Sequence, residues 1–463
     1  MPFRCLTFLL SLALCGCAAV RSYDGELGAT LQQASAGNVD GAIQRLESTR
    51  ASSKDTLYYF ELGMLQRLGK RYEASDKAWL AAQAMIEARD RSTLAAGTDA
   101  LLAASSYLVS DKMRTYEVHD YEKVMLLTYI ALNHLAMGRY EDARVAIKQT
   151  HELEAEIGER RARQITEVEA DAKKRGATVD FKELNGYPVQ ILDNPEVNAL
   201  KNSYQSALSH YLAGFIYESL GEASLAAPGY RLANELQPHQ PALEEALRGL
   251  DQRLSGSQDG MTDVLFIVGS GTAPTLRAQQ FQFPVMVDYR TVFIPVSFPV
   301  LLPAAMEDAP TGLLVGGAQR LTLTRIASID LMARRGLKDD MPGIMLRAAV
   351  RSTASAVLQV QAQRNSKSNA APALGLAVAL ASAVFQSADD RTWRTLPGEI
   401  YIARARLPPG AHQITVQTRL GANTARVDIS GRYAVIDFRV LSRQLFVQAP
   451  GERNENVSRE GMQ

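Results

Sequence analysis

Cysteine is almost absent from this chain of 463 residues. The three cysteines are Cys5, Cys15 and Cys17, so no position after residue 17 carries a thiol. A disulfide framework, a cysteine zinc cluster and a cysteine nucleophile all need thiols, and the body of the protein can therefore contain none of them. A chain of this length and ordinary apolar content can build a sizeable hydrophobic core in two or three domains.

An excess of charge of either sign is also missing. Lysine and arginine together number 50, and so do aspartate and glutamate, which gives a formal net charge of zero. A nucleic-acid-binding protein normally carries a basic domain or stripe, so this balance argues against nucleic acid as a partner. It also gives no sign of electrostatic attraction to an anionic membrane surface.

The chain has no apolar run long enough to cross a bilayer, which takes about 20 residues. The run Leu6–Leu14 follows Arg4, a layout typical of a secretory signal peptide. The run Ala373–Phe385 is apolar on all sides, so we expect it either in the protein interior or in lipid. We interpret it as part of a buried helical hairpin, with membrane insertion as the alternative.

The first apolar run ends in Leu-Cys-Gly-Cys at residues 14–17. This resembles the bacterial lipobox, which has an aliphatic residue three places before the cysteine and a small residue directly before it. The resemblance implies removal of residues 1–16 and lipidation of Cys17, and several acyl chains together give stable anchoring. Ala18 follows in place of aspartate, which in the lipoprotein sorting pattern favours the outer membrane. The alternative is an ordinary secreted protein in which Cys17 is not lipidated.

Recognisable catalytic and metal-binding motifs are missing. Gly269–Pro274 (GSGTAP) lacks the Gly-Lys-Ser/Thr of a phosphate loop and the Gly-x-Ser-x-Gly of a hydrolase, so we predict a turn there. The histidines form no zinc-binding pattern; they are His119, His134, His151, His210, His239 and His412. The sequence therefore predicts no catalytic residue, no metal site and no cofactor.

Two adjacent acids could be mistaken for a catalytic carboxylate pair. Asp389 and Asp390 stand directly before Arg391 and close to Trp393. Adjacent side chains point apart on a strand or a helix, so two neighbouring carboxylates rarely act together. We predict a structural ion pair beside an aromatic anchor.

A repeating helical pattern is present between residues 22 and 254. Each unit places small residues where two helices must touch and large residues in the grooves between them. The first unit has Tyr59, Leu62, Gly63, Tyr72, Ser75, Trp79 and Ala82; the second has Leu127, Ile130, Ala131, Gly138, Tyr140, Ala143 and Ile147; the third has Ala213, Gly214, Tyr217, Gly221, Ala226, Tyr230 and Ala233; a weaker half-unit has Gly37, Val39, Ala42 and Leu46. This recurrence predicts a small helical solenoid.

These units resemble the tetratricopeptide repeat (TPR), a helix–turn–helix unit of about 34 residues. The chain is also similar to an uncharacterised family of bacterial TPR-containing outer-membrane lipoproteins, in the stretches 105–149, 209–222 and 389–410. That family tends to have a glycine and an acidic residue shortly after the tyrosine that corresponds to Tyr116, and the glycine is missing here. The resemblance implies a fold and a location more than a function.

The first helices of TPR units line a concave face at fixed offsets, and the resemblance carries these offsets onto twelve positions. They are Leu57, Phe60, Met64, Arg67, Met125, Thr128, Leu132, Leu135, Leu208, Tyr211, Phe215 and Glu218. Such a largely apolar set with three aromatic rings suits an amphipathic helix or an extended peptide of a protein partner. The alternative is that the segment Arg89–Lys123 or the C-terminal domain covers this face and uses it as core.

Turn-forming residues at 255–260 (SGSQDG) separate the helical pattern from a region of alternating apolar and polar residues. The predicted strands are Val264–Val268, Phe281–Tyr289, Thr291–Val296, Leu321–Ile326, Glu399–Arg404, Gln413–Thr418, Ala425–Ile429 and Tyr433–Val440, and a helix is predicted over Pro342–Arg364. The predicted fold class is α+β. A TPR-like helical domain (17–254) and a linker precede a β-rich, sandwich-like domain (261–448) with a buried helical hairpin, and a polar disordered tail (449–463) follows.

Together these features predict a lipid-anchored periplasmic adaptor or scaffold that binds protein partners of the cell envelope, in cell-wall synthesis or envelope assembly, and that is not an enzyme. One alternative is an enzyme that processes envelope polymers at the domain junction, which would need a cluster of acidic or histidine side chains in one cleft. A second alternative is a membrane-active assembly subunit that uses Ala373–Phe385.

Overall fold

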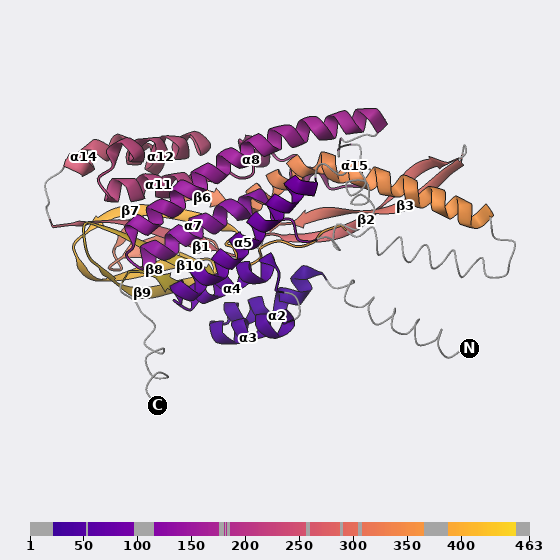
Figure 1. Cartoon of the computed structure of the whole chain (residues 1–463). Helices are drawn as coiled ribbons and strands as arrows, with labels where there is room; N and C mark the ends of the chain where they lie inside the picture. Colours follow the sequence, from indigo (N-terminus) through magenta and orange to yellow (C-terminus); the bar gives the residue numbers. More distant parts are fainter. Residues whose placement is uncertain are drawn as a thin grey trace.

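The structure, a computed structural model, describes residues 22–51, 54–96, 115–175, 180, 182, 186–255, 260–287, 290–303, 308–364 and 388–450. The predicted signal peptide, Cys17, the apolar run Ala373–Phe385 and the tail from residue 451 lie outside the described residues. The chain is α+β: an N-terminal region of helices is followed by a C-terminal region of strands with one long helix (Figure 1).

Helical hairpins build the N-terminal region. They are α2 (Tyr23–Ser35) with α3 (Val39–Thr49), α4 (Thr56–Leu68) with α5 (Tyr72–Ala96), α7 (Asp120–Ala136) with α8 (Tyr140–Arg175), and α11 (Ala207–Ser219) with α12 (Ala223–Leu236). The shorter helices are α9 (Val189–Leu192), α10 (Pro195–Ala199), α13 (Pro241–Arg248) and α14 (Leu250–Ser255). The predicted half-unit is therefore a full hairpin, α2 with α3.

Each of these four hairpins turns through one residue with left-handed backbone geometry. That residue is Gly37, Gly138 or Gly221 in three of the turns and Lys70, with φ of 58°, in the fourth. In all four turns the second helix begins two residues later. Glycine adopts this geometry without the steric penalty of a Cβ atom, which explains why it is the usual choice. The shared turn confirms the repeating pattern.

The C-terminal region contains two sheets and a separate hairpin. A five-stranded sheet has the order β11–β10–β1–β7–β6, and a four-stranded sheet has the order β5–β4–β8–β9. The strands are β1 (Thr262–Ser270), β4 (Pro310–Val315), β5 (Gln319–Leu321), β6 (Thr324–Ser328), β7 (Glu399–Leu407), β8 (Gly410–Thr418), β9 (Gly421–Ile429), β10 (Tyr433–Leu441) and β11 (Gln444–Gln448). β1 pairs with β10 in parallel and with β7 antiparallel.

The five-stranded sheet is buried on both faces. In β1, Val264, Phe266 and Val268 pack into a cluster shared with the four-stranded sheet. Leu265 and Ile267, which point to the opposite face, join a core shared with the helices. The helical region and the β region are therefore joined through one hydrophobic core.

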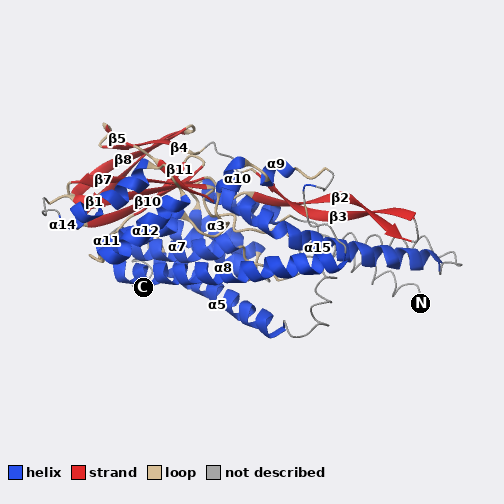
Figure 2. Cartoon of the chain, turned by 90° about the horizontal axis from the view of Figure 1, so that it is seen from above, coloured by secondary structure: helices blue, strands red, loops and turns tan. Residues whose placement is uncertain are grey.

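A long hairpin and a long helix project from one end of the molecule. The hairpin consists of β2 (Thr275–Val287) and β3 (Arg290–Leu302), and α15 (Ile329–Arg364) runs beside it, away from β8 and β9 (Figures 1 and 2). α15 also contacts α8. Within the described ranges, no helix combines the length and the apolar character that crossing a membrane requires.

Several predicted boundaries are wrong. The predicted helix Pro342–Arg364 is only the C-terminal part of α15, which carries Pro342 in its interior. The predicted strand Leu321–Ile326 is split between β5 and β6, which belong to different sheets. The pattern does not predict β4 or β11, because both are short and lack a clear alternation of buried and exposed residues. Ala449, assigned to the tail, is buried between the sheets.

Candidate functional site

The twelve residues predicted to line a concave face are all buried. Leu57, Phe60, Met64 and Arg67 lie on α4, Met125, Thr128, Leu132 and Leu135 on α7, and Leu208, Tyr211, Phe215 and Glu218 on α11. None of them exposes more than 2% of its surface. The C-terminal region contacts this face, so the structure has the alternative arrangement, in which these residues form core and line no open groove.

An irregular segment just before β7 occupies part of this face. It comprises Asp389–Leu396 (DDRTWRTL), and we call it the anchor segment. The fully buried indole of Trp393 stacks on the ring of Phe60, with the two centroids 4.5 Å apart. Trp79 of α5 and Tyr129 of α7 complete the slot, with centroids 6.0 Å and 6.5 Å from that of Trp393. The predicted aromatic anchor is confirmed.

Two buried glutamates bind the backbone of the anchor segment. Glu122 on α7 accepts a hydrogen bond from the backbone N–H of Trp393 at 2.7 Å. Glu61 on α4 accepts from the N–H groups of Arg394 and Thr395 at 2.8 Å and 3.0 Å. Hydrogen bonds to a carboxylate are stronger than those between neutral groups. Three consecutive backbone donors are thus held by the first helices of two hairpins.

Glu61 has an unusual electrostatic environment. Burial raises the pKa of its carboxyl group to about 7, although the hydrogen bonds from Thr395, Arg394 and Tyr23 favour the ionised form. The hydroxyl of Tyr23 on α2 donates to the same carboxyl group at 3.1 Å. A glutamate with this pKa changes its charge close to neutral pH, which an exposed glutamate does not do.

Ionic contacts lie within the anchor segment and between this segment and α2. Arg391 and Asp389 lie 2.7 Å apart, which confirms the predicted ion pair. Arg394 pairs with Asp24 of α2 at 3.0 Å. Asp390 accepts a backbone N–H from the start of α2 at 3.2 Å, so it does not act together with its neighbour. The two acids therefore have separate structural roles.

A second polar contact joins α4 to the five-stranded sheet. Arg67 pairs with Asp437 of β10 at 2.7 Å and also donates to the side chain of Asn133 on α7. Burial raises the pKa of Asp437, and the charge of Arg67 offsets only part of this rise. The polar residue that the sequence placed on the concave face of α4 thus binds the C-terminal region of the same chain.

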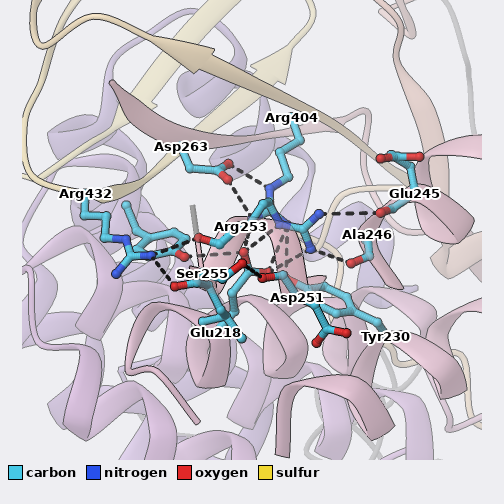
Figure 3. Close-up of polar contacts among 12 residues, drawn as sticks. Glu218, Tyr230, Glu245, Ala246, Asp251, Arg253, Ser255, Asp263, Arg404 and Arg432 are labelled. Carbon is cyan, nitrogen blue, oxygen red and sulfur yellow. Dashed lines mark hydrogen bonds and ion pairs between the residues drawn. The ribbon is translucent and has the colours of Figure 1, made fainter. Parts of the chain in front are cut away.

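A third polar contact joins α11 to the same sheet (Figure 3). Glu218 lies 2.7 Å from both Arg404 of β7 and Arg253 of α14, and the hydroxyl of Tyr230 donates to it at 2.6 Å. Arg404 also pairs with Asp263 of β1 at 2.7 Å. Burial alone would raise the pKa of Glu218, but the hydrogen bonds and charges of the two guanidinium groups outweigh it and lower the pKa.

A cavity of about 700 Å³ lies between α8, α15 and the loop 201–204. Its wall contains Asp120, which pairs with Arg160 and Arg161 of α8. Arg161 also pairs with Asp340 of α15. These acidic and basic groups therefore pair with one another in the wall of the cavity.

A pair of histidines packs between α8 and α11. The rings of His151 and His210 stack with centroids 4.9 Å apart, and His210 lies 2.9 Å from Glu154. Burial, helped by the charge of His210, lowers the pKa of His151 to about 4. Among the residues that the structure describes, no group of three or more histidine, cysteine or acidic side chains could hold a metal ion.

Sequence reasoning missed Glu61 and Glu122. Glu61 stands in a strongly apolar helical stretch, between Phe60 and Leu62, whereas Glu122 lies in the polar first turn of α7, between Tyr121 and Lys123. A carboxylate buried among apolar residues is costly unless its oxygens accept hydrogen bonds. An acid inside an apolar stripe was therefore the signal that could have identified Glu61, and Glu122 has no such signal in the sequence.

No protein-family model and no curated protein matches the chain. Among solved structures, a tetratricopeptide repeat protein from Parabacteroides merdae is similar to part of it, with 12% sequence identity and a TM-score of 0.14. The alignment covers 50% of this chain and 98% of that one. A TM-score this low supports no inference about fold or function.

Proposed function

We propose that this chain is a non-enzymatic adaptor of the bacterial cell envelope whose TPR-like helices hold protein partners. The observation that supports this best is the anchor segment. The helices α4, α5 and α7 bind an irregular piece of chain through its backbone N–H groups and one aromatic side chain. Contacts of this kind suit a scaffold that recognises peptides.

The proposal includes anchoring to the outer membrane, on its periplasmic side, through lipid on Cys17. The support is the lipobox at residues 14–17. The test is incorporation of labelled palmitate by the unmodified chain and by Cys17→Ser, followed by carbonate extraction of membranes. We expect label and membrane retention in the unmodified chain only, because lipid supplies the anchor. Cys15→Ser is the matched control and should keep the label. A Cys17→Ser chain that stays in carbonate-washed membranes would contradict this anchor.

Because the chain itself fills the concave face, a partner has to contact other surfaces in addition to that face. Large apolar side chains are exposed on the second helices of three hairpins. They are Leu80 on α5, Val145 on α8 and Leu225 on α12, which expose 56%, 53% and 44% of their surface. Single exposed apolar residues do not define an interface, so we use these three as probe positions on the outer side of the hairpins.

The adaptor function is tested by in-cell photo-crosslinking. A photoreactive amino acid replaces Leu80, Val145 or Leu225, and the buried Phe215 serves as the control. We expect capture of one dominant envelope protein from at least one exposed position and only crosslinks within the chain from the buried one. Capture of no envelope protein from any exposed position would count against an adaptor.

A further inference from the structure

The anchor segment contacts the helices in the way a bound peptide would. Its backbone N–H groups at Trp393, Arg394 and Thr395 are consecutive, and all three donate to carboxylates of the first helices, Glu122 and Glu61. Backbone donors are present in every peptide except at proline, so these contacts are independent of sequence. They select an extended or irregular chain over a helix, whose interior N–H groups are already bonded.

One side chain of the anchor segment supplies specificity. Trp393 fills a slot made by Phe60, Trp79 and Tyr129, and none of its surface is exposed. A deeply buried tryptophan is the residue type that most often dominates a binding interface. Its indole N–H donates to the hydroxyl of Thr395 within the segment at 3.0 Å, so the slot does not have to supply an acceptor for it.

We propose that α4, α5 and α7 form a binding site for extended peptides that carry a tryptophan, and that the anchor segment is its resident ligand. The partner class is a protein segment with one tryptophan and free backbone N–H groups on that residue and the next two. This deepens the proposed adaptor function and rests on it. A tethered ligand competes at an effective concentration of about millimolar, so a partner segment displaces it only when the partner also binds elsewhere on the chain.

The test uses the full chain with Trp393→Gly, which leaves the slot without its side chain. The probe is a synthetic peptide with the sequence of residues 389–396 (DDRTWRTL), and its control has alanine in place of tryptophan. We expect the tryptophan peptide to bind this variant at least 100-fold more tightly than the unmodified chain, and at least tenfold more tightly than the control peptide binds. A second substitution, Glu122→Gln, should weaken binding at least tenfold, because the amide keeps the shape of the carboxylate but loses its charge.

A folded Trp393→Gly chain that binds both peptides equally, or binds neither, would overturn the proposal. If this variant does not fold, hydrogen exchange on the unmodified chain decides the question. A resident ligand should leave its site without unfolding of the sheet. The amides of Trp393, Arg394 and Thr395 should then exchange at least tenfold faster than those of Leu265 and Phe266 in β1. Equal rates would show that the segment opens only with the whole fold, and would overturn the proposal.

The outcomes separate this site from the adaptor function. Peptide binding without any envelope protein captured in cells would support the peptide-binding site and contradict the adaptor function. Capture of a partner from the exposed probe positions, together with no peptide binding, would support the adaptor function and contradict the peptide-binding site.

Discussion

At the scale of single residues, buried charge is the main feature of this molecule. Glu61 bonds the anchor segment from a position with no exposed surface, and Asp437 and Glu218 are almost as deeply buried. A buried carboxylate is tolerated because donors surround it, and each such group makes stability depend on pH. The direction of that dependence differs between groups.

Glu61 should make the fold less stable as pH rises towards neutrality. Its carboxyl group has a pKa of about 7 in the folded chain and about 4.5 in the unfolded chain. The contribution is therefore fully present below pH 4.5 and is lost as pH rises through 7, by up to about 3 kcal/mol. Glu61→Gln removes this titration. Urea unfolding at several pH values should show the unmodified chain losing more stability than the variant between pH 4.5 and 8. Parallel curves would contradict the assignment.

His151 should make the fold less stable as pH falls, the opposite of the effect of Glu61. Its pKa is about 4 in the folded chain, against 6.5 when unfolded, so its contribution is present above pH 6.5 and is lost as pH falls through 4. His151→Phe keeps a ring against His210 but cannot take up a proton. We expect the variant to lose less stability than the unmodified chain between pH 6.5 and 4.5, measured as melting temperature. A larger loss in the variant would refute this role.

At the scale of elements, the hairpins share a contact between residues 16 positions apart. Gly63 on α4 faces Trp79 on α5, and Gly214 on α11 faces Tyr230 on α12. A Cβ atom built on Gly214 would lie 2.6 Å from the ring of Tyr230. Each large ring thus requires a missing side chain on the opposite helix, which is why small and large residues recur together in the sequence.

Substitution of Gly63 by alanine tests this packing. An added Cβ atom would overlap the indole of Trp79, so we expect Gly63→Ala to destabilise the chain by about 1–3 kcal/mol in denaturant unfolding. The control is Gly28→Ala in α2, where an added Cβ atom meets nothing within 4 Å. That change should stabilise the chain by about 0.5–1 kcal/mol through helix propensity. Equal effects at the two sites would argue against close helix contact at Gly63.

The hairpins could be predicted because their signals are local. Small and large residues and the turn glycines lie within one repeat, so the pattern of Gly138 and Tyr140 is readable without the rest of the chain. The anchor segment could be predicted only as an ion pair beside an aromatic ring. The position of this segment against the helices could not be predicted from the sequence. One of its hydrogen bonds joins Glu61 and Arg394, which are 333 positions apart. The twelve concave positions lie on the first helices of their hairpins, as predicted. That the C-terminal region buries them could not be predicted, because this burial depends on the same long-range contacts.

At the scale of the whole molecule, three buried polar clusters are among the contacts that attach the helices to the C-terminal region. They are centred on Glu61 with Glu122, on Arg67 with Asp437, and on Glu218 with Arg404. Each lies inside or beside apolar core, where an unpaired charge is costly. These contacts therefore specify how the two regions dock as well as adding to their attraction.

Glu218→Gln should loosen this docking. Without the carboxylate, Arg404 and Arg253 are left with excess positive charge in a buried site, and we expect a loss of about 2–4 kcal/mol in unfolding free energy. Glu245→Gln is the matched control, because its ion pair with Arg248 is exposed on both sides and should change stability by less than about 0.5 kcal/mol. A loss at Glu218 no larger than at Glu245 would show that the cluster does not hold the two regions together.

The parallel pairing of β1 with β10 sets the order in which the molecule can be completed. β1 meets its neighbour over Asp263–Ser270 and Tyr433–Val440, so this side of the strand has no partner until synthesis reaches residue 440. The helices are made long before that point, with Phe60 and Phe215 still uncovered. A chain that stops early keeps this apolar face bare, and chaperones and proteases act on such surfaces. The parallel pairing thus makes completion of the five-stranded sheet depend on one of the last strands to be synthesised.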